Sequence, residues 1–146
     1  MKLIELITAQ SARLKQAGVS FGHGTTNAFD EAAWLVLAAL GLPLDALEER
    51  AQHELSAEDE ARAIALVDER IATRKPAAYL TKEAWLQNVP FYVDERVIVP
   101  RSFIAELLAD GEGEGTLDAW LSDGTQRVLD LCTGNGSLAV IAAMAY

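Results

Sequence analysis

The chain has 146 residues, which suits one domain of ordinary size or a small domain followed by part of another. Hydrophobic residues make up 51% of it and charged residues 23%, a composition that supports a packed core and excludes an intrinsically disordered chain. The net charge of −10 disfavours an electrostatic contact with an exposed phosphate backbone, so we expect no direct binding to nucleic acid.

Cysteine content and apolar runs bear on the cellular compartment. The single cysteine, Cys132, cannot form a disulfide within the chain, and the first residues lack the long apolar stretch of a secretion signal. The richest apolar run, residues 32–42, is shorter than the roughly 20 residues that cross a bilayer. We therefore expect a cytoplasmic protein with no membrane partner.

The first half of the chain has the pattern of a helical bundle. Apolar residues recur at three- and four-residue intervals over residues 2–17, and Gly18 follows as a helix stop. Asn27 is a good N-cap for a second helix over residues 28–40, which Gly41 ends.

Two further helices complete this predicted bundle. A short helix is expected over residues 45–51, and Ser56 with Asp59 has the spacing of a capping box for a helix that runs to about Arg74. The apolar periodicity of that last helix predicts a buried stripe of Ala61, Ile64, Ala65, Leu66, Val67 and Ile71. We therefore expect a bundle of four or five helices over residues 1–83.

No residue of the bundle has the setting of a catalytic or metal-binding group. His23 and His53 lie far apart in the sequence, with no acid or cysteine around them at metal-ligand spacing, so surface or capping roles and no metal site are expected. Trp34 lies on an apolar helix and is expected in the core. The bundle is therefore interpreted as a substrate-recognition domain.

After the bundle the pattern changes from helical to extended. Apolar segments over residues 84–87, 91–93 and 97–99 indicate a β-hairpin, which we expect as a linker over residues 84–101. A helix over residues 103–109, with Ser102 as its cap, is expected next. An acidic glycine-rich loop, a helical turn and a polar turn are then predicted over residues 111–115, 117–121 and 122–124.

The last stretch has the features of a cofactor-binding turn. Residues 127–131 have the pattern of a strand, and an alanine-rich helix is expected to begin near Ser137. Between them, Gly134 and Gly136 permit close approach of the backbone to a ligand, the helix N-terminus offers unpaired N–H groups, and Asp130 can accept hydrogen bonds. Tight strand-to-helix turns also use glycine for purely steric reasons, so the turn alone leaves both interpretations open.

Three blocks of the sequence, in this order, resemble the protein glutamine N5-methyltransferases. The blocks are Arg-Ile-Ala-Thr-Arg-Lys-Pro-Ala-Ala-Tyr-Leu at 70–80, Phe-Tyr-Val-Asp-Glu-Arg-Val-Ile-Val-Pro-Arg at 91–101, and Leu-Asp-Leu-Cys-Thr-Gly-Asn-Gly at 129–136. The resemblance covers essentially the whole chain. It implies S-adenosylmethionine as the methyl donor and a side-chain amide of a protein as the acceptor.

Two details are typical of the branch that modifies large-subunit ribosomal protein number three. Phe-Gly-His-Gly-Thr at 21–25, followed by Asn27 and the pair Asp30 and Glu31, matches that branch. After Arg101 the chain lacks the Pro-Glu-Thr-Glu typical of the release-factor branch, which is kept as an alternative. The resemblance therefore implies a ribosomal protein as substrate.

The fold that this resemblance implies is mainly α. It combines the N-terminal helical bundle and the β-hairpin linker with the first strand and helix of a truncated class I, Rossmann-like α/β methyltransferase domain over residues 102–146. The resemblance assigns cofactor contacts to Asp130, Cys132, Thr133, Gly134, Asn135 and Gly136. Cys132 takes the place of a glycine in most such turns, and a small buried side chain rather than a reactive thiol is expected there.

The assignment of catalytic and substrate residues is limited. The family's Asn-Pro-Pro-Tyr motif, which implies positioning of the substrate amide, is absent from the sequence, so no catalytic residue is assigned and this chain by itself is expected to be inactive. Arg101 is a candidate for contact with substrate or cofactor, and an ion pair that closes the hairpin against the following helix is the alternative.

Two other functions and one consequence for assembly follow from the sequence. A non-catalytic docking module for a basic ribosomal protein fits the acidic bundle, whereas a dinucleotide-dependent oxidoreductase is disfavoured because the turn lacks the third glycine of Gly-x-Gly-x-x-Gly. A strand over residues 127–131 without neighbours would leave its edges unpaired and expose Leu129, Leu131, Val140 and Ile141. Self-association through this region, or disorder in it, is therefore expected.

Overall fold

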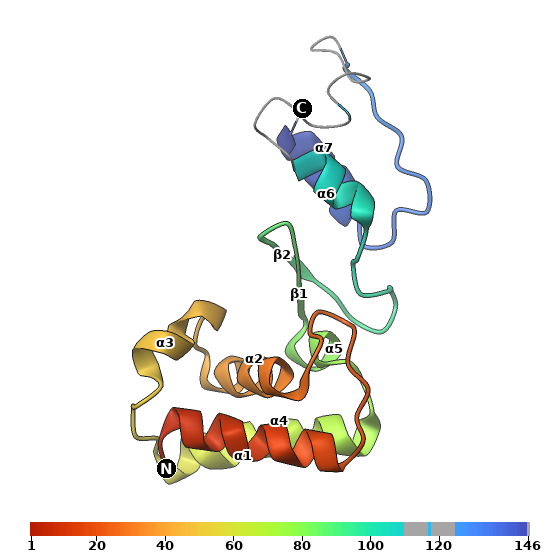
Figure 1. The fold of residues 1–146 in the computed structure, drawn as a ribbon. Coiled ribbons are helices and arrows are strands. Elements are labelled where there is room, and N and C mark those ends of the chain that lie inside the picture. The colour runs from red at the N-terminus through yellow and green to blue at the C-terminus, as the bar shows by residue number, and fades with distance from the viewer. Residues whose placement is uncertain (110–116, 118–124, 146) are drawn as a thin grey trace. The chain divides into compact units, whose positions relative to one another are not determined.

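The computed structural model describes residues 1–109, 117 and 125–145, and these residues are mainly helical (Figure 1). The chain divides into two compact units, Met1–Thr81 and Lys82–Tyr146. Each unit has its own buried residues, and each is described separately below.

The first unit is a helical bundle, as predicted. Its elements are α1 (Leu3–Gln16), α2 (Ala28–Leu40), the 3₁₀ helix η1 (Leu44–Ala46), α3 (Leu47–Arg50), α4 (Ala57–Thr73) and α5 (Ala77–Thr81). The short helix expected over residues 45–51 is thus a 3₁₀ turn continued by one α-helical turn. The sequence pattern does not predict α5, because a helix of five residues is too short to show an apolar period.

Local sequence signals set the ends of these helices. The Asn27 side chain accepts hydrogen bonds from the amides of Phe29 at 3.0 Å and Asp30 at 2.9 Å, so it caps α2 as predicted. The Ser56 hydroxyl accepts from the Asp59 amide at 3.1 Å and caps α4. Gly41, with φ of +67°, ends α2 in the left-handed conformation that favours glycine.

The core of the bundle is centred on α2, which packs against both α1 and α4. Every residue of α2 from Glu31 to Leu37 is buried, Trp34 among them as expected. From α1, Leu3, Leu6, Ile7 and Leu14 complete the core. A helix whose apolar face extends this far around its axis is stable in water only between partners, so α2 is the element that the other helices cover.

The buried stripe expected on α4 was only partly right. Val67 is buried, but Ala61 and Ala65 are exposed, while Ala63 and Arg70 are buried instead. Positions 63, 67 and 70 recur at the four- and three-residue spacing of one helix face, and position 65 lies about 200° around the helix from position 63. The burial of Arg70 was not predicted, because a charged residue is expected on the solvent-facing side of a helix.

The second unit begins with an antiparallel hairpin of β1 (Glu83–Leu86) and β2 (Val89–Tyr92). Gln87 and Asn88 connect the strands with φ of +49° and +59°, the positive values of a two-residue type I′ hairpin turn. The predicted hairpin is therefore confirmed, with a tighter turn than the extended segments suggested. Residues 97–99 do not form a strand.

Two helices and the hairpin form a small core in the second unit. The helices are α6 (Phe103–Ala109) and α7 (Ser137–Ala145), and the Ser102 hydroxyl accepts a hydrogen bond from the Ile104 amide at 3.2 Å, as expected of a cap. The buried residues of this core come from the two helices: Ala105, Leu108, Ile141 and Ala142. Partly buried apolar residues pack against them: Leu86 and Phe91 of the hairpin, Leu117, and Leu138 of α7.

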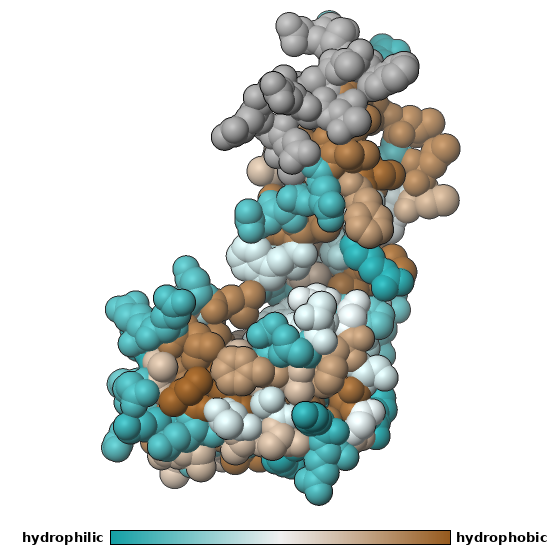
Figure 2. All heavy atoms as spheres, in the orientation of Figure 1, coloured by the Kyte–Doolittle hydropathy of each residue, from teal (hydrophilic) through white to brown (hydrophobic). Residues whose placement is uncertain are grey.

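The predicted strand over residues 127–131 is not formed, which corrects the sequence-based expectation. A strand requires a neighbour for its backbone N–H and C=O groups, and no strand of the described residues pairs with this segment. Leu129 and Leu131 are accordingly 80% and 76% exposed, as expected, and Figure 2 shows apolar side chains open to solvent in this part of the molecule. Ile141 is only 4% exposed, contrary to expectation, because α7 packs on α6.

Some predicted features fall wholly or mainly outside the described residues. They are the loop over 111–115, the helical turn over 117–121 apart from Leu117, and the polar turn over 122–124. Within the described ranges, no helix is long and apolar enough to cross a membrane.

Candidate functional site: the turn before α7 and the buried ion pair of the bundle

The predicted cofactor turn joins an extended segment to α7 through three residues with positive φ. Cys132, Gly134 and Gly136 have φ of +60°, +58° and +83°. Glycine adopts this left-handed region without steric cost, whereas at Cys132 the same conformation is strained. The alternation of left-handed with ordinary residues folds the backbone tightly in front of the helix N-terminus.

Hydrogen bonds within the turn hold this shape. The Thr133 hydroxyl donates to Asp130 Oδ2 at 2.8 Å, and the Gly136 amide donates to the Thr133 carbonyl at 2.9 Å. Asn135 Oδ1 accepts from the Ser137 amide at 3.2 Å and so satisfies one of the unpaired N–H groups at the start of α7. The sequence did not predict this role of Asn135, although asparagine just before a helix is a recognised signal.

One donor of the turn is buried and has no partner. It is Nδ2 of Asn135, the only such side-chain atom among the described residues. A buried polar group without a hydrogen bond costs free energy, and such a group is commonly satisfied by a ligand or by water. The turn therefore contains a donor without a partner, Asn135 Nδ2, and a carboxylate acceptor, Asp130, which also accepts from the Thr133 hydroxyl.

Exposure differs along the turn. Cys132, Thr133 and Gly134 are exposed, whereas Asn135 and Gly136 are half-buried. The expectation of a buried Cys132 was therefore wrong, because no described strand pairs with the segment before it and supplies side chains that could cover the thiol.

Arg101 is exposed and lies between β2 and α6. The alternative of an ion pair that closes the hairpin against the helix is not realised with any described residue. The ion pair next to the hairpin is formed by Arg96 and Asp94, which both follow β2. The Arg96 guanidinium donates to the Asp94 carboxylate at 2.6 Å and 2.9 Å. These bonds, with the bond from the Arg96 amide, hold the pKa of Asp94 well below its usual range.

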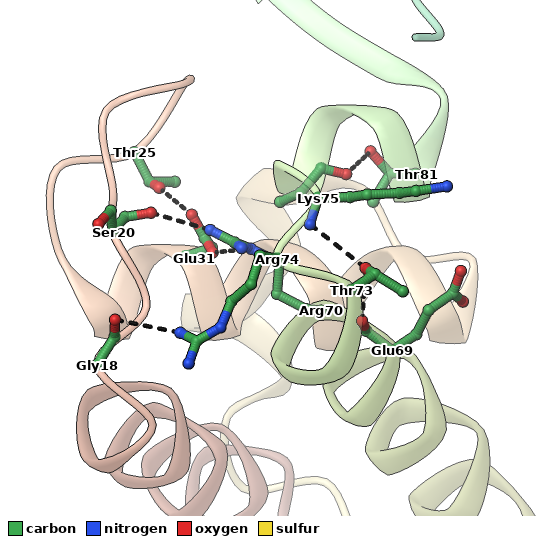
Figure 3. Close-up of polar contacts among 11 residues, drawn as sticks. Gly18, Ser20, Thr25, Glu31, Glu69, Arg70, Thr73, Arg74, Lys75 and Thr81 are labelled. Atoms are coloured by element: carbon green, nitrogen blue, oxygen red, sulfur yellow. Dashed lines mark hydrogen bonds and ion pairs between the residues drawn. The ribbon is translucent and has the colours of Figure 1, made fainter.

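A buried ion pair in the first unit was not predicted. Arg70 Nε donates to Glu31 Oε1 at 2.7 Å, and the two side chains are only 4% and 3% exposed (Figure 3). The Thr25 hydroxyl donates to the other oxygen of Glu31 at 2.9 Å, and Arg70 Nη2 donates to the Ser20 carbonyl at 2.9 Å. Four groups, from α2, α4 and the loop between α1 and α2, are thus joined by hydrogen bonds in one network.

This network fixes the loop that carries the Phe-Gly-His-Gly-Thr sequence. Arg74 adds a bond from Nη1 to the Gly18 carbonyl at 3.1 Å (Figure 3). Gly24 has φ of +108°, and a Cβ built there would lie 2.9 Å from Cζ3 of Trp34, so only glycine fits between the loop and the core. His23 remains exposed, as expected of a surface residue. Gly24 and Thr25 of the motif therefore have structural roles.

The described residues contain no group of three or more His, Cys, Asp or Glu side chains that could hold a metal ion.

Comparison with known proteins identifies relatives for nearly the whole chain. No family model matches the sequence. It is 49% identical over 142 residues to a ribosomal protein uL3 glutamine methyltransferase of Burkholderia pseudomallei, a match to 97% of this chain and 45% of that protein. Proteins of the same name from Bordetella pertussis and Neisseria meningitidis are 48% and 47% identical, over 99% and 92% of this chain and 47% and 44% of their own lengths.

The chain thus spans about half the length of the curated relatives it matches. Identity of this degree over more than nine-tenths of the chain confirms the resemblance noted from its motifs. By sequence, this chain is similar to the ribosomal protein uL3 glutamine methyltransferases over about half of their length.

Proposed function

We propose that this chain is the N-terminal part of an enzyme that transfers a methyl group from S-adenosylmethionine to the side-chain amide nitrogen of a glutamine in ribosomal protein uL3. The observation that carries the proposal is the 49% identity, over 97% of the chain, to a relative named for this activity. The whole enzyme would act in the cytoplasm, where ribosomal proteins are made. The chain alone is expected to be inactive.

In this proposal the turn before α7 is one side of the S-adenosylmethionine site, at the start of a class I, Rossmann-like α/β domain. When bound, the cofactor supplies an electrophilic methyl group on a sulfonium. The contacts assigned to this chain are those of Asp130, Cys132, Thr133, Gly134, Asn135 and Gly136. Support comes from the positive φ of the glycines, which lets the backbone approach a ligand, and from the unpartnered amide of Asn135.

The first unit has a separate role in the proposal, as the domain that recognises the substrate protein. Its helices carry no group with the setting of a catalytic acid or base, and its buried ion pair fixes an exposed loop rather than a pocket. Arg101, which is exposed, remains available for contact with substrate or cofactor. Amide methylation would depend on positioning, since an amide nitrogen is a poor nucleophile.

A chimera tests the proposal directly. The segment of the Burkholderia pseudomallei relative that aligns with this chain is replaced by the chain, and the chimera is incubated with uL3 and S-adenosylmethionine. We expect one methyl group on a uL3 glutamine, located by peptide mass spectrometry. The chimera of the variant Asp130→Asn should show a KM for S-adenosylmethionine raised about tenfold or more, because a charge-assisted acceptor is lost.

The matched control for the chimera is Asp45→Asn, which makes the same substitution at an exposed aspartate of the first unit. Its KM and kcat should equal those of the unsubstituted chimera. A chimera that folds, binds uL3 and leaves it unmethylated would refute the proposed activity. An unchanged KM in the Asp130 variant would refute the assignment of the turn to the cofactor.

A further inference from the structure

The outer face of the hairpin in the second unit carries exposed aromatic side chains. In the β1–β2 register Glu83 lies opposite Tyr92 and Trp85 opposite Pro90, so these four residues share one face. Trp85 and Tyr92 are 45% and 64% exposed, and Pro90 is exposed as well. The two rings occupy diagonal positions across the strands, within reach of one another and of a single ligand.

The opposite face of the same hairpin is anchored. Ala84 is buried, and Leu86 and Phe91 pack against the core formed by α6 and α7. The alternation of strand residues therefore assigns one side to the core and leaves the aromatic side without cover among the described residues of the second unit. The aromatic face rests on a packed base, so its shape is defined before any partner binds.

Hydrogen bonds to carboxylates fix both aromatic rings. Trp85 Nε1 donates to Glu83 Oε1 at 2.7 Å, and the Tyr92 hydroxyl donates to Asp94 Oδ2 at 3.2 Å. Arg96 in turn holds Asp94 through its guanidinium. Each ring thus presents a face to solvent in a fixed orientation. The negative potential of such a ring face attracts a cation.

We propose that the outer face of the hairpin, formed by Glu83, Trp85, Pro90 and Tyr92, is a docking surface for a basic segment of a polypeptide, whose arginine or lysine side chains lie over the two rings. The charge of the chain supports a basic partner, since the net charge is −10 and residues 82–96 hold three carboxylates against two cations. The same charge disfavours a nucleic acid, although bases also stack on aromatic rings. Assignment of the segment to the substrate protein uL3 rests on the proposed function.

The probe for this surface is a short synthetic peptide of alternating arginine and glycine, titrated into the full 146-residue chain. Peptides with glutamate or glutamine in place of arginine serve as charge controls. The readout is the indole N–H signal of Trp85 in a nitrogen–proton NMR spectrum, assigned with the variant Trp85→Phe. We expect the arginine peptide to shift this signal and to bind with an affinity that falls as salt is added.

Two substitutions test the rings themselves. Trp85→Ser and Tyr92→Ser should each weaken binding of the arginine peptide about two- to fivefold, the range expected for one cation–π contact at an exposed site. Phe103→Ser is the matched control, because Phe103 is an exposed aromatic residue of the same unit that lies outside the hairpin. Its affinity should be unchanged.

Several outcomes would overturn the docking surface. The first is a glutamate peptide that binds as tightly as the arginine peptide, and the second is a Phe103→Ser variant that loses as much affinity as the Trp85 and Tyr92 variants. The third is a single-stranded oligonucleotide that binds more tightly than the arginine peptide. The fourth is a Trp85 signal that moves only with protein concentration. The last result would mean that a second copy of the chain covers the face.

The docking test and the chimera fail independently. Peptide binding that survives Trp85→Ser, alongside a chimera that methylates uL3, would remove the docking surface and leave the enzyme assignment intact. Peptide binding that depends on Trp85, alongside an inactive chimera, would leave a basic-peptide site and remove the assignment of its partner to uL3.

Discussion

The buried ion pair between Glu31 and Arg70 leads to a quantitative prediction. Substitution Arg70→Met removes the bond to Glu31 and the bond to the Ser20 carbonyl, and it leaves a carboxylate that is 3% exposed with Thr25 as its remaining partner. An uncompensated buried charge of this kind lowers the free energy of unfolding by about 3–5 kcal/mol. That loss is large relative to the stability of a small domain.

The double substitution gives the decisive comparison. When Glu31→Met is combined with Arg70→Met, no charge remains buried, and the cost is reduced to the hydrogen bonds lost by Thr25 and by the Ser20 carbonyl. At about 1 kcal/mol each, these bonds make the double variant about 1–3 kcal/mol less stable than the unsubstituted chain. The double variant should therefore be more stable than Arg70→Met alone, with a coupling of about 2 kcal/mol or more.

The assay is urea unfolding of the full chain, followed by the helical circular dichroism signal that the first unit dominates. Arg70→Lys, which keeps the charge but loses the planar guanidinium, should fall between the unsubstituted chain and Arg70→Met and remains measurable if the methionine variant is unfolded. The matched control is the exposed ion pair of Arg13 and Asp68, whose side chains are 42% and 53% exposed. Its removal should cost no more than about 1 kcal/mol.

Additive single substitutions would refute this reasoning, as would a cost for Arg70→Met that equals the cost of removing Arg13. Limited proteolysis provides a second check, because Arg70 joins α4 to the loop between α1 and α2 through its bond to the Ser20 carbonyl. Cleavage within residues 18–27 should become faster in Arg70→Met than in the Arg13 control. An unchanged cleavage pattern would mean that the ion pair does not hold the loop.

Three further predictions follow from the structure. Gly24→Ala should lower the free energy of unfolding by about 2–4 kcal/mol, because it strains the backbone and places a Cβ against Trp34 in the core. Gly22→Ala, which has open space around it, should lower that free energy by only about 1–2 kcal/mol. Equal losses in urea unfolding would contradict the clash. The pKa of Asp94, measured by carboxyl NMR, should lie below the ordinary value near 3.9 and rise in Arg96→Gln. Because the folded-state pKa is depressed, the stabilisation is fully present above the ordinary value and is lost as pH falls through the folded-state pKa, and an identical titration in both proteins would refute the pairing. Self-association through the exposed segment before α7 should raise the sedimentation coefficient with concentration, and Leu131→Lys should abolish that rise; a concentration-independent coefficient would exclude this contact.

The candidate turn shows which parts of a site can be predicted from residue types. Positive φ at Gly134 and Gly136 agrees with their glycine identity, since both occupy a turn in front of an alanine-rich helix. The exposure of Cys132 could not be predicted in the same way. Whether a side chain at the start of such a turn is buried depends on neighbouring strands, which are distant in sequence.

The hairpin and the ion pair show the same division between local and distant causes. The extended pattern after the bundle predicted a hairpin, but the turn at Gln87 and Asn88, and with it the face on which Trp85 lies, became clear only from the strand register. Arg70 is assigned to a solvated face by its charge alone. Its burial depends on Glu31, which is 39 residues away in the sequence.

The sequence by itself determined where α2 and α4 begin, because the caps Asn27 and Ser56 act on amides two or three residues away. It also indicated the family, through the order of three blocks of residues. Tertiary structure alone decided which polar groups are buried and which apolar ones are exposed. Burial is a property of contacts between distant segments: Arg70 is enclosed because Glu31 compensates its charge, and Leu131 is exposed because no described strand pairs with its segment.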